Sequence, residues 1–296
     1  MTAHEFGGDW TTEKLERVRK YLSAYTIIFD RNLRARNLFT TYVDAFAGTG
    51  YRSLPQTRSG EDILFPDLIE PENQDFLKGS ARIALEVTPP FKRYIFIECD
   101  PQRSQELERL INEFPQYSNR ISIVNCDANS YLMQWCAQTD WRSNRAVVFL
   151  DPYGMQVEWS LIEAIAKTKA IDLWILFPLG VAINRLLTKT GPPPEQWAQA
   201  LTRFFGTEDW KKDFYPSKKV LTLFGEQDLY TKQADFEKIG QFFVERLKSV
   251  FAAVAENPLP LMNSRNNPLY LLCFAAGNPS GAKTAVHIAQ DILGKR

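Results

Sequence analysis

Four short segments of this chain have the composition of buried strands, and each ends on a carboxylate. Their residues are mostly β-branched, aromatic or aliphatic. The segments are residues 40–44, 94–98, 121–127 and 146–151. A fifth segment, residues 171–177, is almost entirely apolar, which is typical of a strand buried on both faces of a parallel sheet. No other feature constrains the fold as strongly.

Helical segments are expected between these strands, including residues 104–114 and 158–169. Strands that alternate with helices predict a doubly wound, mostly parallel α/β sheet of the Rossmann type. A length of 296 residues fits one such domain, residues 1–296, enlarged by insertions. The sequence has no internal repeats.

The end of the chain is expected to complete the sheet. Residues 236–251 have helical periodicity, and residues 253–262 and 269–276 are expected to form an antiparallel hairpin. With the five parallel strands, this hairpin predicts a seven-stranded sheet.

Three further segments are expected outside the sheet. Residues 11–38 begin as an amphipathic helix, and residues 184–217, rich in aromatic residues, are expected to form a helical cap after the fifth strand. Residues 51–80 form a long connection after the first strand, strongly acidic over residues 52–78, as expected of a lid-like insertion.

One face of the N-terminal helix is basic, with Lys14, Arg17 and Lys20. These residues are interpreted as a solvated face, and the alternative is a contact with an anionic substrate.

Composition excludes several classes of protein. Lys and Arg total 35, as do Asp and Glu, so the chain has no global polycationic character. Four cysteines without a CxxC pair, together with two histidines, argue against a zinc site, and no metal is expected. Residues 1–10 are polar and the longest apolar run, residues 171–183, is too short to cross a bilayer, so a cytoplasmic protein without a membrane partner is expected.

The candidate ligand site follows from the strand ends, because ligands of open α/β sheets bind beyond the carboxyl ends of the strands. Gly48 and Gly50 in the run Asp44-Ala45-Phe46-Ala47-Gly48-Thr49-Gly50 allow a tight turn through which a ligand can approach the backbone. Glu98 is placed to accept both ribose hydroxyls of a nucleoside, and Asp100 is the alternative.

A second candidate motif ends the fourth strand. Asp151 can accept a hydrogen bond from a target amine, Pro152 can hold a backbone carbonyl as a second acceptor, and Tyr153 can stack on a planar base. Together they would orient an amine nitrogen, which is a positioning role and not general-base catalysis.

The glycine run resembles motif I of class I methyltransferases that use S-adenosylmethionine, and a closing hairpin is also typical of their sheet. The run Leu150-Asp151-Pro152-Tyr153-Gly154 looks like a shortened motif IV of amino-methyltransferases, without the usual second proline. The resemblance implies that Asp44, Ala45, Phe46, Gly48 and Gly50 hold the amino-acid end of the cofactor. It also implies that Asp127, with Ala128 beside it, meets the adenine.

Most of the chain also resembles the three-Cys-motif partner proteins, a bacterial family. The resemblance implies a partner with a three-cysteine motif of radical-cofactor type and says little about the reaction. The strings that support it are DAFAGTGYR (44–52), GSARIALEV (79–87), YIFIE (94–98), DWRSNRAVVFLDPYGMQVEW (140–159) and AIDLWILFPLG (170–180).

These patterns favour an S-adenosylmethionine-dependent N-methyltransferase acting on a nucleobase or another planar amine, with RNA or DNA as substrate. The acidic insertion argues mildly against DNA. One alternative is a non-catalytic, cofactor-binding partner of the three-Cys-motif protein. Another is an enzyme that uses the same nucleoside pocket for a different transfer.

Overall fold

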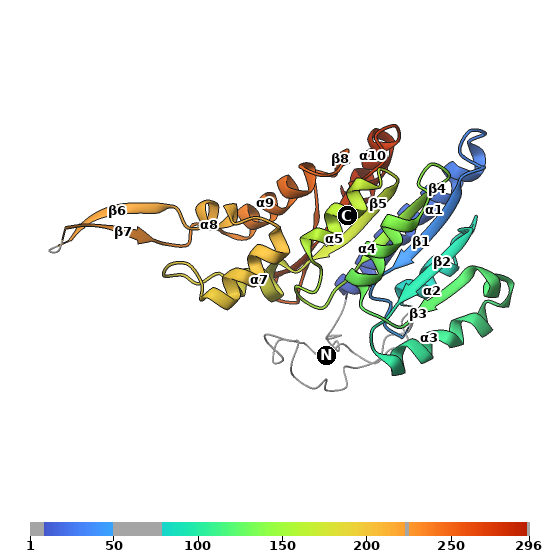
Figure 1. The fold of residues 1–296 in the computed structure, drawn as a ribbon, viewed down its shortest axis with the longest axis horizontal. Helices are drawn as coiled ribbons and strands as arrows, with labels where there is room; N and C mark the ends of the chain where they lie inside the picture. Colours follow the sequence, from blue (N-terminus) through green and yellow to red (C-terminus); the bar gives the residue numbers. More distant parts are fainter. Residues whose placement is uncertain (1–8, 50–78, 223–224, 295–296) are drawn as a thin grey trace, which may run out of the picture.

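A computed structural model describes residues 9–49, 79–222 and 225–294 of the chain (Figure 1). One mixed sheet with helices on both faces forms the body, and a two-stranded hairpin projects from it. No helix in the described part of the chain is long and apolar enough to span a membrane.

The predicted α/β sheet is confirmed. Its strands are β1 (Phe39–Asp44), β2 (Arg93–Ile97), β3 (Ile121–Val124), β4 (Asn144–Leu150), β5 (Ile171–Phe177), β8 (Ala253–Val254), β9 (Leu259–Met262) and β10 (Pro268–Ala276). The order is β3-β2-β1-β4-β5-β10-β8, with β9 also paired to β10. Strands β1 to β5 are parallel, and β10 is antiparallel to β5. The sheet has eight strands and not seven, because the segment expected as residues 253–262 is interrupted and pairs with β10 as two short strands.

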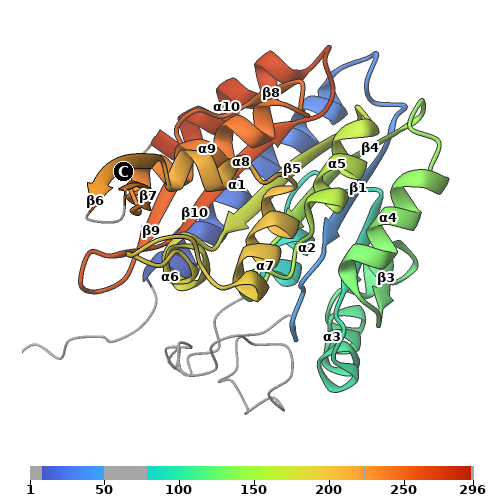
Figure 2. The ribbon, with the colours of Figure 1, turned by 60° about the vertical axis from the view of Figure 1, so that its left-hand side comes forward.

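Helices cover both faces of the sheet, as Figure 2 shows. One face packs against α4 (Ala128–Gln138), α5 (Trp159–Lys167), α7 (Glu195–Phe205) and α9 (Phe236–Lys248). The other packs against α1 (Asp9–Arg31), α2 (Ser80–Leu85), α3 (Pro101–Glu113) and α10 (Ala282–Gly294). Alternate residues of β4 serve the two cores: Val148 and Leu150 contribute to the first, Val147 and Phe149 to the second. Both faces of the strand are therefore buried.

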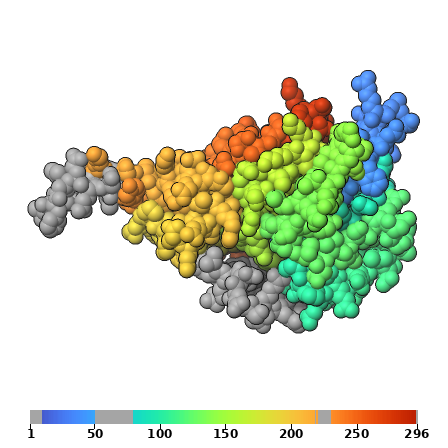
Figure 3. Space-filling view, viewed as in Figure 1, coloured from blue at the N-terminus to red at the C-terminus, as the bar shows by residue number. Residues whose placement is uncertain are grey.

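The insertion after β5 is partly as expected. Residues 184–217 were expected to be helical, and short helices fill most of this range. These helices are α6 (Asn184–Leu186), α7 and α8 (Asp209–Phe214), and the π-helix η3 (Leu179–Ile183) precedes them. The chain then forms the projecting hairpin of β6 (Ser217–Thr222) and β7 (Gly225–Tyr230), which the sequence did not predict (Figures 1 and 3).

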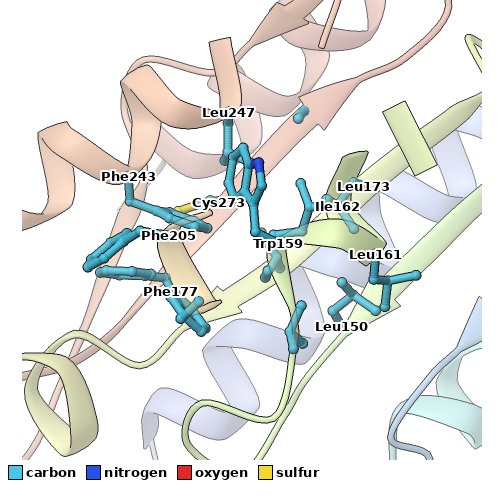
Figure 4. Close-up of a cluster of buried hydrophobic side chains, with 14 of the residues drawn as sticks. Leu150, Trp159, Leu161, Ile162, Leu173, Phe177, Phe205, Phe243, Leu247 and Cys273 are labelled. Carbon is cyan, nitrogen blue, oxygen red and sulfur yellow. The ribbon is translucent and has the colours of Figure 1, made fainter. Parts of the chain in front are cut away.

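Aromatic packing fixes this insertion to the sheet. The ring of Phe177, the last residue of β5, stacks on Phe243 of α9 with centroids 4.2 Å apart, and Phe205 of α7 lies beside them (Figure 4). Gly206 ends α7 with φ +67°, and a Cβ there would lie 2.0 Å from the Trp159 ring. Only glycine lets α7 end this close to α5.

The N-terminal helix is shorter than residues 11–38, because α1 ends at Arg31 and turns follow. Its apolar stripe is confirmed, with Leu15, Val18, Leu22 and Tyr25 all buried. The prediction that the basic face of this helix is solvated was wrong for two residues: Lys14 is 4% exposed and Arg17 is 7% exposed.

Tertiary contacts bury these two cations. Arg17 donates to the backbone oxygen of Ile292 in α10 at 2.6 Å and pairs with Glu13. Lys14 pairs with Asp151 beyond the end of β4. Lys20, by contrast, is exposed and pairs with Glu16 within the helix.

Candidate active site

The parallel register brings the predicted acids to one edge of the sheet. Asp44 ends β1, Glu98 follows β2, and Asp151 follows β4. Within the sheet, Asp44 is paired with Phe96 and with Phe149, so the ends of β2 and β4 flank it on both sides. This is the edge at which ligands of doubly wound sheets bind.

The glycine turn after β1 lies against the end of β2. The Ala47 N–H donates to the Ile97 carbonyl at 3.0 Å, and the Gly48 N–H donates to Glu98 Oε2 at 3.0 Å. Gly48 has φ +61°, and a Cβ there would meet none of the described residues within 4 Å. The turn thus needs glycine for its backbone conformation. Gly50 and most of the insertion at residues 51–80 lie outside the described residues.

Two residues next to Asp44 begin the turn. Ala45 is buried, and its N–H donates to the Phe149 carbonyl at 3.1 Å. The Phe46 N–H returns to Asp44 Oδ1 at 3.3 Å. Both contacts fix the backbone that leads into Gly48.

The structure separates the roles of Glu98 and Asp100. Glu98 is 5% exposed, and its Oε1 accepts the Asp100 N–H at 2.9 Å while Oε2 faces Gly48. Asp100 caps α3, with Oδ1 accepting the N–H groups of Gln102 and Arg103. Glu98 is therefore the acid directed at the glycine turn.

Asp127 starts a helix and does not end a strand. Strand β3 ends at Val124, and Asp127 Oδ1 accepts the Ser130 N–H at 2.8 Å at the start of α4. Asp127 is exposed, whereas Ala128 is buried. Asn125, which the sequence did not single out, donates from Nδ2 to the Glu98 carbonyl at 2.8 Å and joins the ends of β2 and β3.

Asp44 is the most unusual group at this edge. Its side chain is fully buried, and within the described part of the chain its Oδ2 has no hydrogen-bond partner. Burial raises the pKa of Asp44 to about 7 and the Asp151 carboxylate also raises it, while a hydrogen bond from the Ser80 side chain, the Phe46 N–H and Lys14 lower it. Such an unsatisfied buried acceptor is costly to the fold.

Lys14 is a site residue that sequence reasoning did not place here. Its Nζ lies 2.5 Å from Asp151 Oδ2 and 5.3 Å from the centre of the Trp10 ring. Trp10 in turn stacks on Tyr270 of β10, with centroids 5.1 Å apart. The contact spans 137 positions of sequence, and helical periodicity cannot reveal it.

The turn after Asp151 is rigidly held. Pro152 is buried, while the Tyr153 side chain is 56% exposed at the surface. The Tyr153 N–H donates to Gln156 Oε1 at 3.0 Å. Asn129 of α4 holds the same loop: its Nδ2 donates to the Gln156 carbonyl and its Oδ1 accepts the Glu158 N–H. Tyr153 thus presents an exposed ring from a fixed backbone.

The described residues hold no group of three or more His, Cys, Asp or Glu side chains placed to bind a metal ion. The edge instead offers a backbone turn, two buried carboxylates, a half-buried carboxylate with its lysine, and an exposed aromatic ring.

No protein-family model matches the chain, and no curated protein matches it. Among solved structures, a Legionella pneumophila protein of the family model DUF519 has a TM-score of 0.50 at 11% identity, covering 97% of this chain and 92% of that one. Spermidine synthase from Thermotoga maritima has a TM-score of 0.39 at 11% identity, with 100% and 68% covered. A Listeria monocytogenes protein described as a candidate S-adenosylmethionine-dependent methyltransferase has a TM-score of 0.38 at 11% identity, with 88% and 97% covered. The first similarity shows a shared fold over nearly the whole of both chains, and membership of the three-Cys-motif partner family stays a prediction.

The raised pKa of Asp44 predicts a pH dependence of stability. Between about pH 4 and pH 7 the folded protein keeps a proton that the unfolded chain has released, so the free energy of unfolding should fall as pH rises through this window. Asp44→Asn should remove this part of the fall, on the order of 1–4 kcal/mol, in urea titrations from pH 4 to pH 8.

A matched control is available in Asp172. This buried carboxyl accepts from Tyr21 Oη at 2.7 Å, and burial raises its pKa to about 6. Asp172→Asn should change the slope only below about pH 6. Equal slopes for the wild-type protein and Asp44→Asn would show that Asp44 titrates normally.

Proposed function

We propose that this protein binds S-adenosylmethionine at the carboxyl edge of β1 to β4 and transfers its methyl group to the nitrogen of a planar amine, such as a nucleobase. The observation that carries the proposal is the fully buried Asp44 carboxyl group beside the glycine turn, whose Oδ2 has no hydrogen-bond partner among the described residues. A cationic ligand would relieve this group, and S-adenosylmethionine carries a sulfonium and an α-ammonium.

The residues present fit this cofactor. Ala45, Phe46 and Gly48 would form the backbone cradle, because a Cβ at Gly48 would meet none of the described residues within 4 Å. Glu98 would accept the ribose hydroxyls, since an ionised carboxylate offers about four acceptor positions and this one is oriented by two backbone N–H groups. Asp127 and Ala128 would meet the adenine.

Methyl transfer to an amine nitrogen would require the protein to orient the amine more than to move a proton. The cofactor, when bound, supplies the activated methyl group. Asp151 would accept an N–H of the acceptor, the Pro152 turn would keep the backbone fixed, and the Tyr153 ring would stack on the planar base. Because Lys14 forms an ion pair with Asp151 Oδ2, the other carboxylate oxygen, Oδ1, would be the one that accepts a hydrogen bond from the acceptor amine.

A second candidate function is a cofactor-binding partner of a three-Cys-motif protein. The projecting β6–β7 hairpin favours it, because the hairpin is a separate two-stranded sheet that extends beyond the main sheet (Figure 1) and offers backbone for strand pairing. Both functions share the cofactor site, and methyl transfer separates them.

Glu98→Gln should weaken S-adenosylmethionine binding by roughly 10- to 100-fold in calorimetry, because a charged buried acceptor is lost. Asp100→Asn is the matched control. Its side chain caps α3, and asparagine caps a helix about as well as aspartate, so the variant should retain both stability and affinity. If Asp100→Asn alone lost binding, Asp100 and not Glu98 would be the acid that contacts the ribose.

Asp151→Ala and Tyr153→Ala should keep S-adenosylmethionine binding and lose transfer of labelled methyl to bulk cellular RNA or DNA, because they act on the acceptor. Thr168→Ala, in the turn after α5, is a control that should retain both. Wild-type protein that binds the cofactor and a three-Cys-motif protein but methylates nothing, alone or together, would favour the docking function.

A further inference from the structure

Lys14 places an alkylammonium where an acceptor amine would be expected to bind. Its Nζ donates to Asp151 Oδ2 at 2.5 Å and lies over the Trp10 ring. A carboxylate with an aromatic face is the environment in which proteins recognise alkylammonium groups. The subsite therefore has the chemistry of a cation site, and a residue of the chain itself fills it.

The lysine is fixed in this position. Its neighbours Leu15 and Val18 are in the core, and Arg17 ties the same helix to the Ile292 carbonyl of α10. Trp10 is stacked on Tyr270, which closes the subsite on the side of β10. The Lys14 side chain is 5% exposed, so an external amine can take its place only by displacing a buried ion pair.

We infer that Lys14 is the specificity-determining residue of the acceptor site: it occupies the cation-binding oxygen of Asp151 and leaves the other oxygen to an uncharged amine. The acceptor class that follows is a neutral planar amine, and alkylammonium groups such as polyamines and protein lysines are excluded. The acceptor role of Asp151 rests on the proposed function; the filled cation subsite does not.

The exclusion has a simple electrostatic cause. A second ammonium bound to Asp151 would lie near Lys14 Nζ. Two like charges about 4 Å apart at an effective dielectric constant of about 20 lower affinity by roughly two to three powers of ten. A neutral exocyclic amine on a base does not incur this repulsion and can still donate to the carboxylate.

Chemical rescue tests the inference without any methyl transfer. Lys14→Ala removes the part of the side chain that n-propylammonium reproduces and leaves the Asp151 carboxylate partly buried. Propylammonium chloride should raise the melting temperature of Lys14→Ala by roughly 3–6 °C at about ten times its dissociation constant. Tetramethylammonium chloride at equal ionic strength, which has no N–H donor, should not.

Two further proteins complete the experiment. Wild-type protein, with or without S-adenosylhomocysteine, should not respond to propylammonium, and neither should Lys14→Ala/Asp151→Asn. If Lys14→Ala does not fold alone, recovery of its folded state on refolding in the presence of propylammonium chloride replaces the melting temperature as the readout. Stabilisation of the wild-type protein by propylammonium, or no effect of propylammonium on Lys14→Ala, would overturn the inference. Failure of the proposed function has a different signature, the absence of S-adenosylmethionine binding.

Discussion

The ion pair between Lys14 and Asp151 joins the first helix to the end of the fourth strand, at the edge of the sheet where the predicted site residues meet. Both residues are largely withdrawn from water, and Asp44 lies close enough for its pKa to respond to each of them. Burying charges in this way is costly unless they compensate one another. Lys14 compensates the charge of Asp151, and the buried Asp44 beside them has its pKa raised to about 7.

The fold makes this arrangement possible through strand direction. Five parallel strands place their carboxyl ends at one edge, so acids that are far apart in the sequence meet there. The turns that carry them are held by backbone contacts: Gly48 to Glu98, Asn125 to the carbonyl of Glu98, and Asn129 to the loop after Asp151. Aromatic packing of the insertion against Phe177 supports the neighbouring strand (Figure 4). The described backbone at this edge is therefore held by contacts within the fold itself.

Strand composition predicted the parallel sheet and its acids because both depend on local pattern and on one rule of topology. Lys14 was misplaced because a helical pattern distinguishes apolar from charged positions and contains no information on a partner 137 residues away. The third strand was expected to reach Asp127, but β3 ends at Val124 and Asp127 is the N-cap of the following helix, α4. The β6–β7 hairpin lies apart from the sheet, so no alternation of core-facing and solvent-facing residues in the sequence predicts it. Asp44 was expected to contact a cofactor, but its complete burial without a partner for Oδ2 is visible only in three dimensions.

Proton release on cofactor binding tests most directly whether this edge is a site for a cationic nucleoside. Calorimetric titration of S-adenosylmethionine at pH 7, in two buffers of different ionisation enthalpy, gives the number of protons released. Because a cationic ligand favours ionised Asp44, whose pKa is about 7, the wild-type protein should release up to about half a proton more than Asp44→Asn. Absence of binding, or equal proton release by the two proteins, would contradict the assignment of this edge to the cofactor.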